Sequence, residues 1–388
     1  MSGTEGPLHA ADEWFNHQIV ETQAFVVESD RSWTEKVCAM TAARDGSLQA
    51  GFGVGKYPNR GVFDGYASVS RGKEQWTVRA SRRLSADPDL LGAGPLTYRI
   101  DEPLRTIRFT CAANDAAPIA FDWTFTSVAV PVLEARDRTR ARAGYRLDTH
   151  LLRYHQTGIA RGWVEVDGER TEITEDSWFT TRDHSWGVRH DVGQPLTDLE
   201  PSYGFGPGVG FRFSWSPMLL ERPDGSRYAL HHQYRETRAF GYQERRFEGT
   251  VESADAPVEH LATMVPELRY HPTNRRVLGG TFQFTMADGS ARPVSVEALG
   301  DTGVHLGAGL YFGFDGHHHG DWRSALHVDG EHIPDCTDPA AVPRLHQIRD
   351  AVMKVSDPVG GGTGWCNLQT MIVGAWPELG LDEASSFV

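Results

Sequence analysis

The chain of 388 residues has few cysteines and lacks the sequence patterns of disulfide frameworks, cysteine zinc sites and membrane segments. It contains only four cysteines, Cys38, Cys111, Cys336 and Cys366, and no two of them form a CxxC pair. We therefore expect four reduced thiols, with neither a cysteine zinc site nor a disulfide framework. The sequence also lacks a signal-peptide pattern and any apolar run of about 18 residues. It predicts no integral membrane segment and a cytoplasmic location.

Basic charge and nucleotide-binding motifs are also scarce. Lys and Arg number 38 against 52 acidic residues, which leaves a net charge of −14 without a basic block. A nucleic-acid-binding protein needs a basic patch, and this acidic chain has none, so we exclude that class of function. No GxGxxG or GxxxxGK[ST] follows a predicted strand, and no GxSxG or HExxH motif occurs. We expect no cofactor, no metal and no partner nucleic acid, and the sequence leaves the oligomeric state open.

Aromatic residues are plentiful, and many recur with a period of two. Apolar side chains alternate with polar ones in three segments, 121–126, 211–216 and 281–286. This alternation is typical of strands with one buried face. The dipeptide Asp-Gly, which suits tight hairpins, occurs seven times. The segments Trp163–Ile173 and Met218–Gln233 are the clearest hairpins.

The spacing of these strands predicts an all-β protein of antiparallel barrels or sandwiches with few short helices. We expect helices only at Asp338–Val355, which carries a possible N-cap, and near Ala11–Gln23. A stretch rich in Gly and Pro, Gly187–Gly210, separates two halves of similar size. We place the two domains at residues 18–192 and 200–376.

The densest group of side chains that could take part in catalysis is in the segment TTRDHSWGVR, residues 180–189. In an extended strand, His184 and Trp186 share one face, a proton-transfer group beside an apolar wall. A neighbouring carboxylate would raise the basicity of the imidazole, and Asp183 is the candidate for it. The alternative is structural, with a core Trp186 and an ion pair between Asp183 and an arginine such as Arg189.

Residues 154–189, and RDHSWGVR above all, resemble the middle of the carotenoid 1,2-hydratase-like group of proteins. The segments 24–61 and 322–331 resemble its flanks more weakly. The resemblance implies two lipocalin-like (calycin) β-barrel domains and functional roles for His184 and Trp186. The group's further Tyr and Asp have no match here, because Phe211 and Phe213 occupy the corresponding spacing.

Other histidines and aromatics are weaker candidates. His231 and His232 are adjacent on a predicted strand, so one points inward and the other is expected at the surface. We include His232, Tyr234 on the same face, Trp215 and Arg189 as candidate substrate-binding residues. The run His317–His319 follows an Asp-Gly turn and is expected to be a solvated loop without a metal.

Three functions remain open. The first is a cofactor-independent hydratase or dehydratase, a lyase that acts on a bulky apolar terpenoid, steroid or polyketide-like molecule. There His184 with Asp183 would act as acid or base, Trp186 would form the apolar wall, and Arg189 would hold Asp183 or polarise a substrate oxygen. The second is an isomerase or cyclase of such a substrate, and the third is a non-catalytic carrier of a lipophilic ligand.

Overall fold

The computed structural model describes residues 7–17, 29–140, 146–197, 199 and 206–388. Regular structure in this part of the chain is almost entirely antiparallel β, which confirms the predicted fold class. No helix among these residues exceeds four residues. None is long and apolar enough to cross a membrane.

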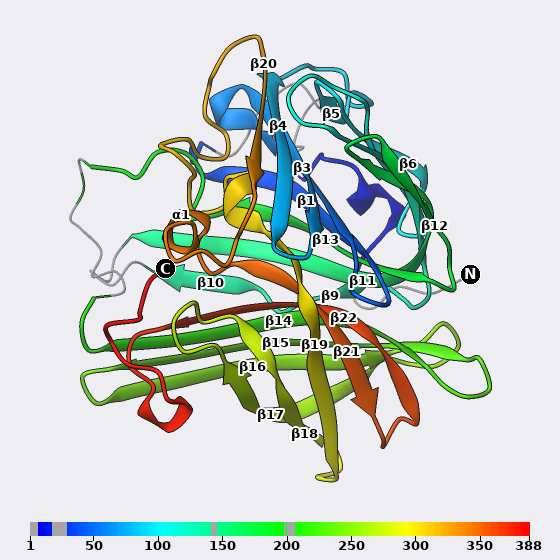
Figure 1. Ribbon diagram of the computed structural model, residues 1–388, viewed down its shortest axis with the longest axis vertical. Coiled ribbons are helices and arrows are strands. Elements are labelled where there is room, and N and C mark those ends of the chain that lie inside the picture. Colours follow the sequence, from blue (N-terminus) through cyan, green and yellow to red (C-terminus); the bar gives the residue numbers. More distant parts are fainter. Residues whose placement is uncertain (1–6, 18–28, 141–145, 198, 200–205) are drawn as a thin grey trace.

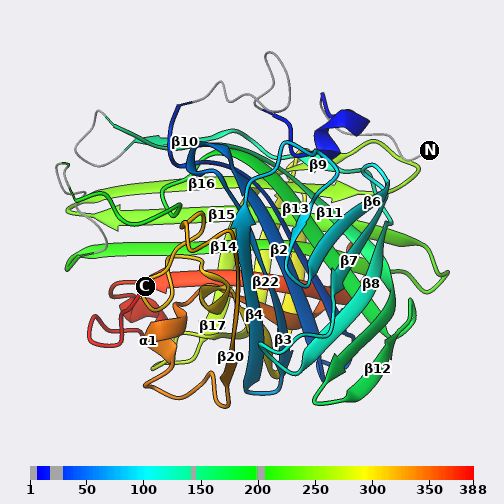
Figure 2. The ribbon, with the colours of Figure 1, turned by 90° about the horizontal axis from the view of Figure 1, so that it is seen from above.

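The first sheet is curled and has 14 strands, of which β1 to β13 come from the N-terminal half and β20 from the C-terminal half (Figures 1 and 2). Its main strand order is β20-β4-β3-β2-β1-β13-β11-β8-β7-β6-β5, and β9, β10 and β12 pair with β11. The strands are β1 (Trp33–Ala43), β2 (Gln49–Tyr57), β3 (Val62–Arg71), β4 (Glu74–Arg83), β5 (Gly92–Ala93), β6 (Leu96–Glu102), β7 (Thr106–Cys111), β8 (Ile119–Ser127), β9 (Val132–Leu133), β10 (Asp137–Arg140), β11 (Leu147–Val166), β12 (Glu169–Ile173), β13 (Trp178–Val188) and β20 (Leu326–Ile333).

The C-terminal half forms a closed barrel in the order β14-β15-β16-β17-β18-β19-β21-β22. Its strands are β14 (Val209–Glu221), β15 (Arg227–Ala239), β16 (Tyr242–Glu252), β17 (Glu259–Tyr270), β18 (Val277–Met286), β19 (Ala291–His305), β21 (Arg349–Asp357) and β22 (Gly362–Val373). The short helices are η1 (Ala10–Glu13), η2 (Pro58–Arg60), η3 (Leu306–Gly309), α1 (Val342–Leu345) and η4 (Pro377–Leu379).

The local patterns predicted these strands well and one helix badly. The three alternating segments lie in β8, β14 and β18, and both predicted hairpins form, as β11–β12 and β14–β15. The helix predicted over Asp338–Val355 is wrong, because only Val342–Leu345 is helical and Arg349–Asp357 is β21. A short apolar run is compatible with the periodicity of a helix and with that of a strand. Here the segment is a strand because it pairs with β19 and β22. At the other predicted helix, η1 forms at Ala10–Glu13, and residues 18–23 lie outside the described residues.

The two sheets pack against each other through the convex face of the first. Its concave face encloses an apolar core that includes Trp123, Phe52 and Phe109. Its convex face meets the barrel through polar contacts, such as Asn367 Nδ2 donating to Thr181 Oγ1 at 2.8 Å.

The second half of the chain is not confined to the barrel. Residues 306–348, between β19 and β21, form what we call the crossing segment. It crosses the convex face of the first sheet with η3, and its strand β20 then pairs with β4 (Figure 1). The division at residues 192 and 200 stays a prediction, and residues 198 and 200–205 within the predicted linker lie outside the described residues.

Candidate functional site

Strand β13 carries the sequence RDHSWGV through the centre of the first sheet, between β1 and β11. Because side chains alternate along a strand, Arg182, His184 and Trp186 point to the concave face. Asp183 and Ser185 point to the convex face, toward the barrel and the crossing segment. The segment therefore contributes to two separate sites.

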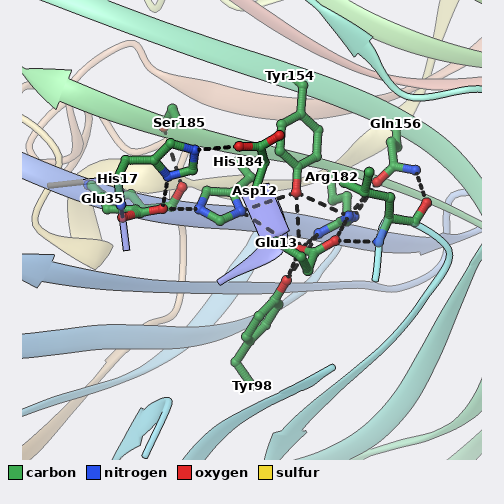
Figure 3. A network of polar contacts seen from close by, with 12 residues as sticks. Asp12, Glu13, His17, Glu35, Tyr98, Tyr154, Gln156, Arg182, His184 and Ser185 are labelled. Carbon is green, nitrogen blue, oxygen red and sulfur yellow. Dashed lines mark hydrogen bonds and ion pairs between the residues drawn. The ribbon is translucent and has the colours of Figure 1, made fainter. Parts of the chain in front are cut away.

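On the concave face, His184 lies in a buried polar group that we call the inner network: Glu13, Glu35, Tyr154, Arg182 and His184 (Figure 3). The Nε2 atom of His184 lies 3.0 Å from Glu35 Oε1, and its Nδ1 lies 3.1 Å from the Tyr154 hydroxyl. Arg182 donates to both oxygens of Glu13, at 2.7 and 2.6 Å. Tyr154 also donates to Glu13, at 3.1 Å.

The charges of the inner network stabilise one another. Burial alone would lower the pKa of His184, but the hydrogen bonds and charges of Glu13 and Glu35 outweigh it and raise the pKa. Burial likewise acts to raise the pKa of Glu35, yet His17 and His184 lower it to about 2. The raised pKa favours the charged form of His184, and both ring nitrogens have partners.

His17 connects this network to the surface. Its Nδ1 lies 2.5 Å from Glu35 Oε1, and its ring stacks on Trp186 with 3.7 Å between centroids. The side chain of His17 is 12% exposed, whereas that of His184 is wholly buried. Trp186 shares a face with His184, as expected, at an edge-to-face centroid distance of 6.0 Å.

The expected pairing of His184 with Asp183 is wrong. The carboxylates around His184 are Glu13 and Glu35, because consecutive residues of a strand point to opposite faces. Asp183 lies on the convex face, where burial raises the pKa of its carboxyl. Arg189 donates a hydrogen bond to Ser185 Oγ and lies close enough to Asp183 to favour its charged form.

The convex face near Asp183 holds a second polar group, the outer cluster: Lys36, Tyr57, Asp64, Arg189 and His319. Lys36 lies on β1, Tyr57 at the end of β2, Asp64 on β3, Arg189 just after β13, and His319 in the crossing segment. The Nδ1 atom of His319 lies 3.4 Å from Asp64 Oδ1. Asp64 Oδ2 accepts a hydrogen bond from the Gly320 amide at 2.7 Å.

The outer cluster differs from the inner network because several of its polar atoms have no hydrogen-bond partner among the described residues. Among the described residues, no hydrogen-bond partner is found for Lys36 Nζ, Tyr57 Oη, Asp64 Oδ1, Arg189 Nε or either ring nitrogen of His319. All but Arg189 are buried residues. Unpartnered buried polar atoms are costly and usually mark a site that binds water, an ion or a substrate.

Burial changes the protonation of this cluster. It lowers the pKa of Lys36 to about 8, with Arg189 acting in the same direction. Burial and then the charge of Lys36 lower the pKa of His319, which favours its neutral form. The Lys36 ammonium lies over the Tyr311 ring, 4.0 Å from its centroid.

Glycines on β2 make room for this arrangement. Gly51, Gly53 and Gly55 all face the convex side, and a Cβ on Gly55 would lie 2.6 Å from Tyr57 Oη and 3.0 Å from Lys36 Cγ. A side chain there would displace both groups.

The remaining candidate residues lie elsewhere. His232 is buried inside the barrel, 3.0 Å from Ser214 Oγ and against Phe282. Tyr234 shares its face, as expected, and donates to Glu236 at 2.7 Å. Trp215 lies between the sheets and donates to Glu134 at 3.0 Å.

Two further expectations about histidines are wrong. His231 and His232 are both buried, at 1% and 0% exposure, because the face of β15 that carries His231 is covered by the first sheet. In the run 317–319, His317 is exposed but His319 is buried at 2%. The crossing segment turns His319 back onto Tyr57 and Asp64, a long-range contact that no local pattern indicates.

Sequence reasoning also missed Glu13, His17, Glu35, Lys36 and Asp64. None of them belongs to a catalytic motif, and Asp64, in one of the seven Asp-Gly dipeptides, lies inside β3 and not in a hairpin turn. The alternation of β1 places Glu35 and Lys36 on opposite faces, which the sequence does show, but their partners come from other strands. The local signal that could have drawn attention to the site is the GxGxG run of β2.

Three solved structures align with most of the chain. A protein provisionally named AttH from Nitrosomonas europaea shares 11% identity at a TM-score of 0.48, with 87% of this chain and 92% of that chain covered. Kievitone hydratase from Nectria haematococca shares 10% identity at a TM-score of 0.42, with 95% and 96% covered. CghA, determined with Sch210972, shares 11% identity at a TM-score of 0.40, with 88% of each chain covered.

No curated protein sequence matches the chain. Residues 8–382 match the model of a family of unknown function (DUF8625). The chain belongs to that family.

Proposed function

We propose that the protein is a cofactor-independent lyase that adds or removes water on a largely apolar small molecule, with the outer cluster as its active site. The observation that carries the proposal is the buried pair of Asp64 and His319. The Nδ1 side of the imidazole faces the carboxylate at 3.4 Å, and no described residue is bonded to its Nε2. A carboxylate in this position holds the tautomer of a histidine that acts as a general base.

The acid strengths in the cluster restrict the reaction. An isolated alkene needs a far stronger acid than an ammonium group with a pKa of about 8. A carbon–oxygen bond at the carbon β to a carbonyl needs a much weaker acid, because the charge that develops when the α proton leaves rests on the carbonyl oxygen. The cluster therefore favours a β-hydroxy carbonyl compound or its conjugated enone, as found in polyketide-like molecules, over an isolated terpenoid double bond.

For dehydration, neutral His319 removes the proton next to the carbonyl through Nε2. The resulting enolate oxygen is stabilised by the ammonium group of Lys36 and by the hydroxyl of Tyr57. Neither Lys36 Nζ nor Tyr57 Oη has a hydrogen-bond partner among the described residues. As the enolate collapses, the carbon–oxygen bond breaks, and the leaving hydroxide takes the proton from His319 as water. Hydration is the reverse of the same steps.

A group of apolar side chains packs beside the cluster, and in this proposal it contacts the apolar part of the substrate. Met40, Tyr66, Val304, Leu306 and Tyr311 form one buried group with Cys38. Tyr311 lies both under Lys36 and edge-to-face with His319, at 4.9 Å between centroids. Polar groups at the edge of an apolar surface are typical of small-molecule sites.

The inner network has a supporting role in this proposal. His184, the candidate acid or base from sequence, has partners on both ring nitrogens, and Arg182 and Glu13 neutralise each other beside it. It holds β13 in place, so that Asp183, Ser185 and Arg189 face the outer cluster. His17 and Trp186 line the opposite face.

The test compares His319→Gln with His317→Gln, an exposed neighbour in the same run. A panel of β-hydroxy ketones and their enones is incubated in ¹⁸O-labelled water and analysed by mass spectrometry. We expect His319→Gln to lose about 10²- to 10⁴-fold in turnover, as is typical for a general base, and His317→Gln to retain it. Lys36→Met should remove the alkaline limb of the pH profile near pH 8.

Other outcomes separate the alternatives. Full turnover by His319→Gln, with loss in His184→Gln, would move the acid–base role to the inner network. A product that is isomeric with the substrate and contains no ¹⁸O would indicate an isomerase. Saturable binding without product from any of the compounds would indicate a carrier.

A further inference from the structure

A pocket of about 320 Å³ lies beside the ends of β17, β18 and β21, where the barrel meets the crossing segment. Its wall includes Arg276, just before β18, Asp301 on β19, and Arg349, the first residue of β21. Thr337 of the crossing segment closes another side. The volume is in the range of small-molecule sites, roughly 300–1,000 Å³. None of the residues that line it belongs to the outer cluster or the inner network.

The backbone of β19 makes room for the guanidinium of Arg349. The pairing of β19 with β21 shifts its register between Ala298 and Gly303. A Cβ on Gly303 would lie 2.5 Å from Arg349 Nε, so a side chain at that position would displace the guanidinium. The irregular strand and its glycine therefore hold a cation at the edge of the pocket.

The two arginines are buried, but they share a single carboxylate. The side chain of Arg276 is 9% exposed, and Arg349 is 6% exposed. Arg276 donates to Asp301 Oδ1 at 2.9 Å. Among the described residues, Arg349 forms no ion pair and donates only to the carbonyls of Asp301 and Thr302, at 2.6 and 2.9 Å. One of the two positive charges thus lacks a counter-ion in the part of the chain that the structure describes.

The same two side chains carry unused donors. The Nε atoms of Arg276 and Arg349 are buried, and neither has a hydrogen-bond partner among the residues described. Burial and then the charge of Arg276 lower the pKa of Arg349, yet a guanidinium keeps its proton in proteins. A buried charge in this state is costly unless an anion compensates it.

His305, the partner of Arg349 in the strand register, adds no further charge. Its Nε2 lies 3.3 Å from Arg276 Nη2, which can only donate a hydrogen bond. Burial and the charges of Arg276 and Arg349 lower the pKa of His305, which favours its neutral form. At the rim, Lys73 is paired with Asp335 at 3.8 Å. The group therefore has one positive charge in excess.

We infer that this pocket binds the carboxylate of a small, partly apolar organic acid, with Arg349 as its counter-ion. One excess charge matches a monoanion better than a doubly charged phosphate. A planar guanidinium can bind a carboxylate through two parallel hydrogen bonds. Val277, Leu278 and Ala298 supply an apolar wall for the rest of the molecule. The inference does not depend on the proposed lyase, because the two sites have no residue in common.

The test titrates hexanoate into the full chain by calorimetry, in a buffer free of phosphate and of other carboxylates. Hexanamide, which has nearly the same size and no charge, is the matched control ligand. We expect saturable binding of one hexanoate per chain, no binding of hexanamide and weaker binding of inorganic phosphate. Hexanoate should also raise the melting temperature.

Two variants change the charge of the pocket in opposite directions. Arg349→Met should weaken hexanoate binding about 10- to 100-fold, as the loss of a charged hydrogen bond does. Arg161→Met, which removes an arginine that is 75% exposed on β11, should leave the affinity unchanged. Asp301→Asn frees Arg276 of its counter-ion. It should strengthen hexanoate binding at least about 5-fold and strengthen phosphate binding more.

Three results would overturn the inference. They are equal binding of hexanoate and hexanamide, unchanged hexanoate affinity in Arg349→Met, and tighter binding of phosphate than of hexanoate by the wild type. Should Arg349→Met fail to fold, Asp301→Asn decides, because its side chain is 48% exposed and a variant without increased affinity contradicts the inference. Lys36→Met should keep hexanoate binding, and loss there instead of in Arg349→Met would assign the carboxylate to the outer cluster.

Discussion

Replacing Glu35 by Gln removes the one carboxylate that His17 and His184 share. Glu35 Oε1 lies 2.5 Å from His17 Nδ1 and 3.0 Å from His184 Nε2, and Oε2 accepts a hydrogen bond from the His17 amide at 3.2 Å. The side chain is 3% exposed, so solvent screens these contacts little. Glutamine keeps the shape and loses the charge, which leaves two histidines without their common counter-ion.

The pKa of Glu35 sets the size of the effect. Burial opposes the shift, but His17 and His184 lower the pKa from 4.5 to about 2. At 1.36 kcal/mol per pKa unit, the charged carboxylate contributes about 3 kcal/mol to folding. Because the folded pKa lies below the unfolded one, this contribution is complete above about pH 4.5 and is lost as the pH falls toward 2. About 1 kcal/mol of it remains at pH 3.

Urea unfolding of the wild type and Glu35→Gln at pH 7 and pH 3 measures this. We expect the difference in the free energy of unfolding to be about 3 kcal/mol at pH 7 and about 1 kcal/mol at pH 3. Glu172→Gln, on the exposed part of β12, serves as the control and should change neither value. A loss of equal size at both pH values would refute the electrostatic origin of the effect.

Further predictions concern other parts of the molecule. Gly55→Ala should lower any activity of the outer cluster and cost about 1–3 kcal/mol in urea unfolding, because its Cβ would lie 2.6 Å from Tyr57 Oη. Asp357→Asn should cost about 3–5 kcal/mol by the same measurement, since it breaks the buried pair with Arg292 at 2.6 Å. The four buried cysteines should react with a thiol reagent only when the protein unfolds, and rapid reaction of the native protein would contradict this.

Local patterns predicted the strands because their cause is local. A strand with one buried face needs alternating apolar residues, and Phe282 and Phe284 show that alternation in the sequence as clearly as in β18. The tight turns at Asp167–Gly168 and Asp224–Gly225 could be predicted for the same reason, since positive φ values favour glycine. Arg349–Asp357 shows the limit of this approach, because a short apolar run becomes a strand only when neighbouring strands pair with it.

The sites depended on contacts that no local pattern contains. Glu13 reaches Arg182 across 169 positions, and Glu35 reaches His184 across 149. His319 was expected in solvent and instead lies against Asp64, because the chain leaves the barrel after β19 and crosses the first sheet.

The sequence by itself determined that this protein is built from antiparallel strands, that its cysteines are unpaired thiols, and that TTRDHSWGVR lies on a strand with two differently occupied faces. These properties follow from the period of the side chains and from residue types. Only the tertiary structure decided which face of β13 meets which partners. Strand order and the crossing segment depend on packing across the whole chain. They place His184 among satisfied charges, and they leave Lys36 Nζ, Asp64 Oδ1 and the ring nitrogens of His319 without hydrogen-bond partners among the described residues.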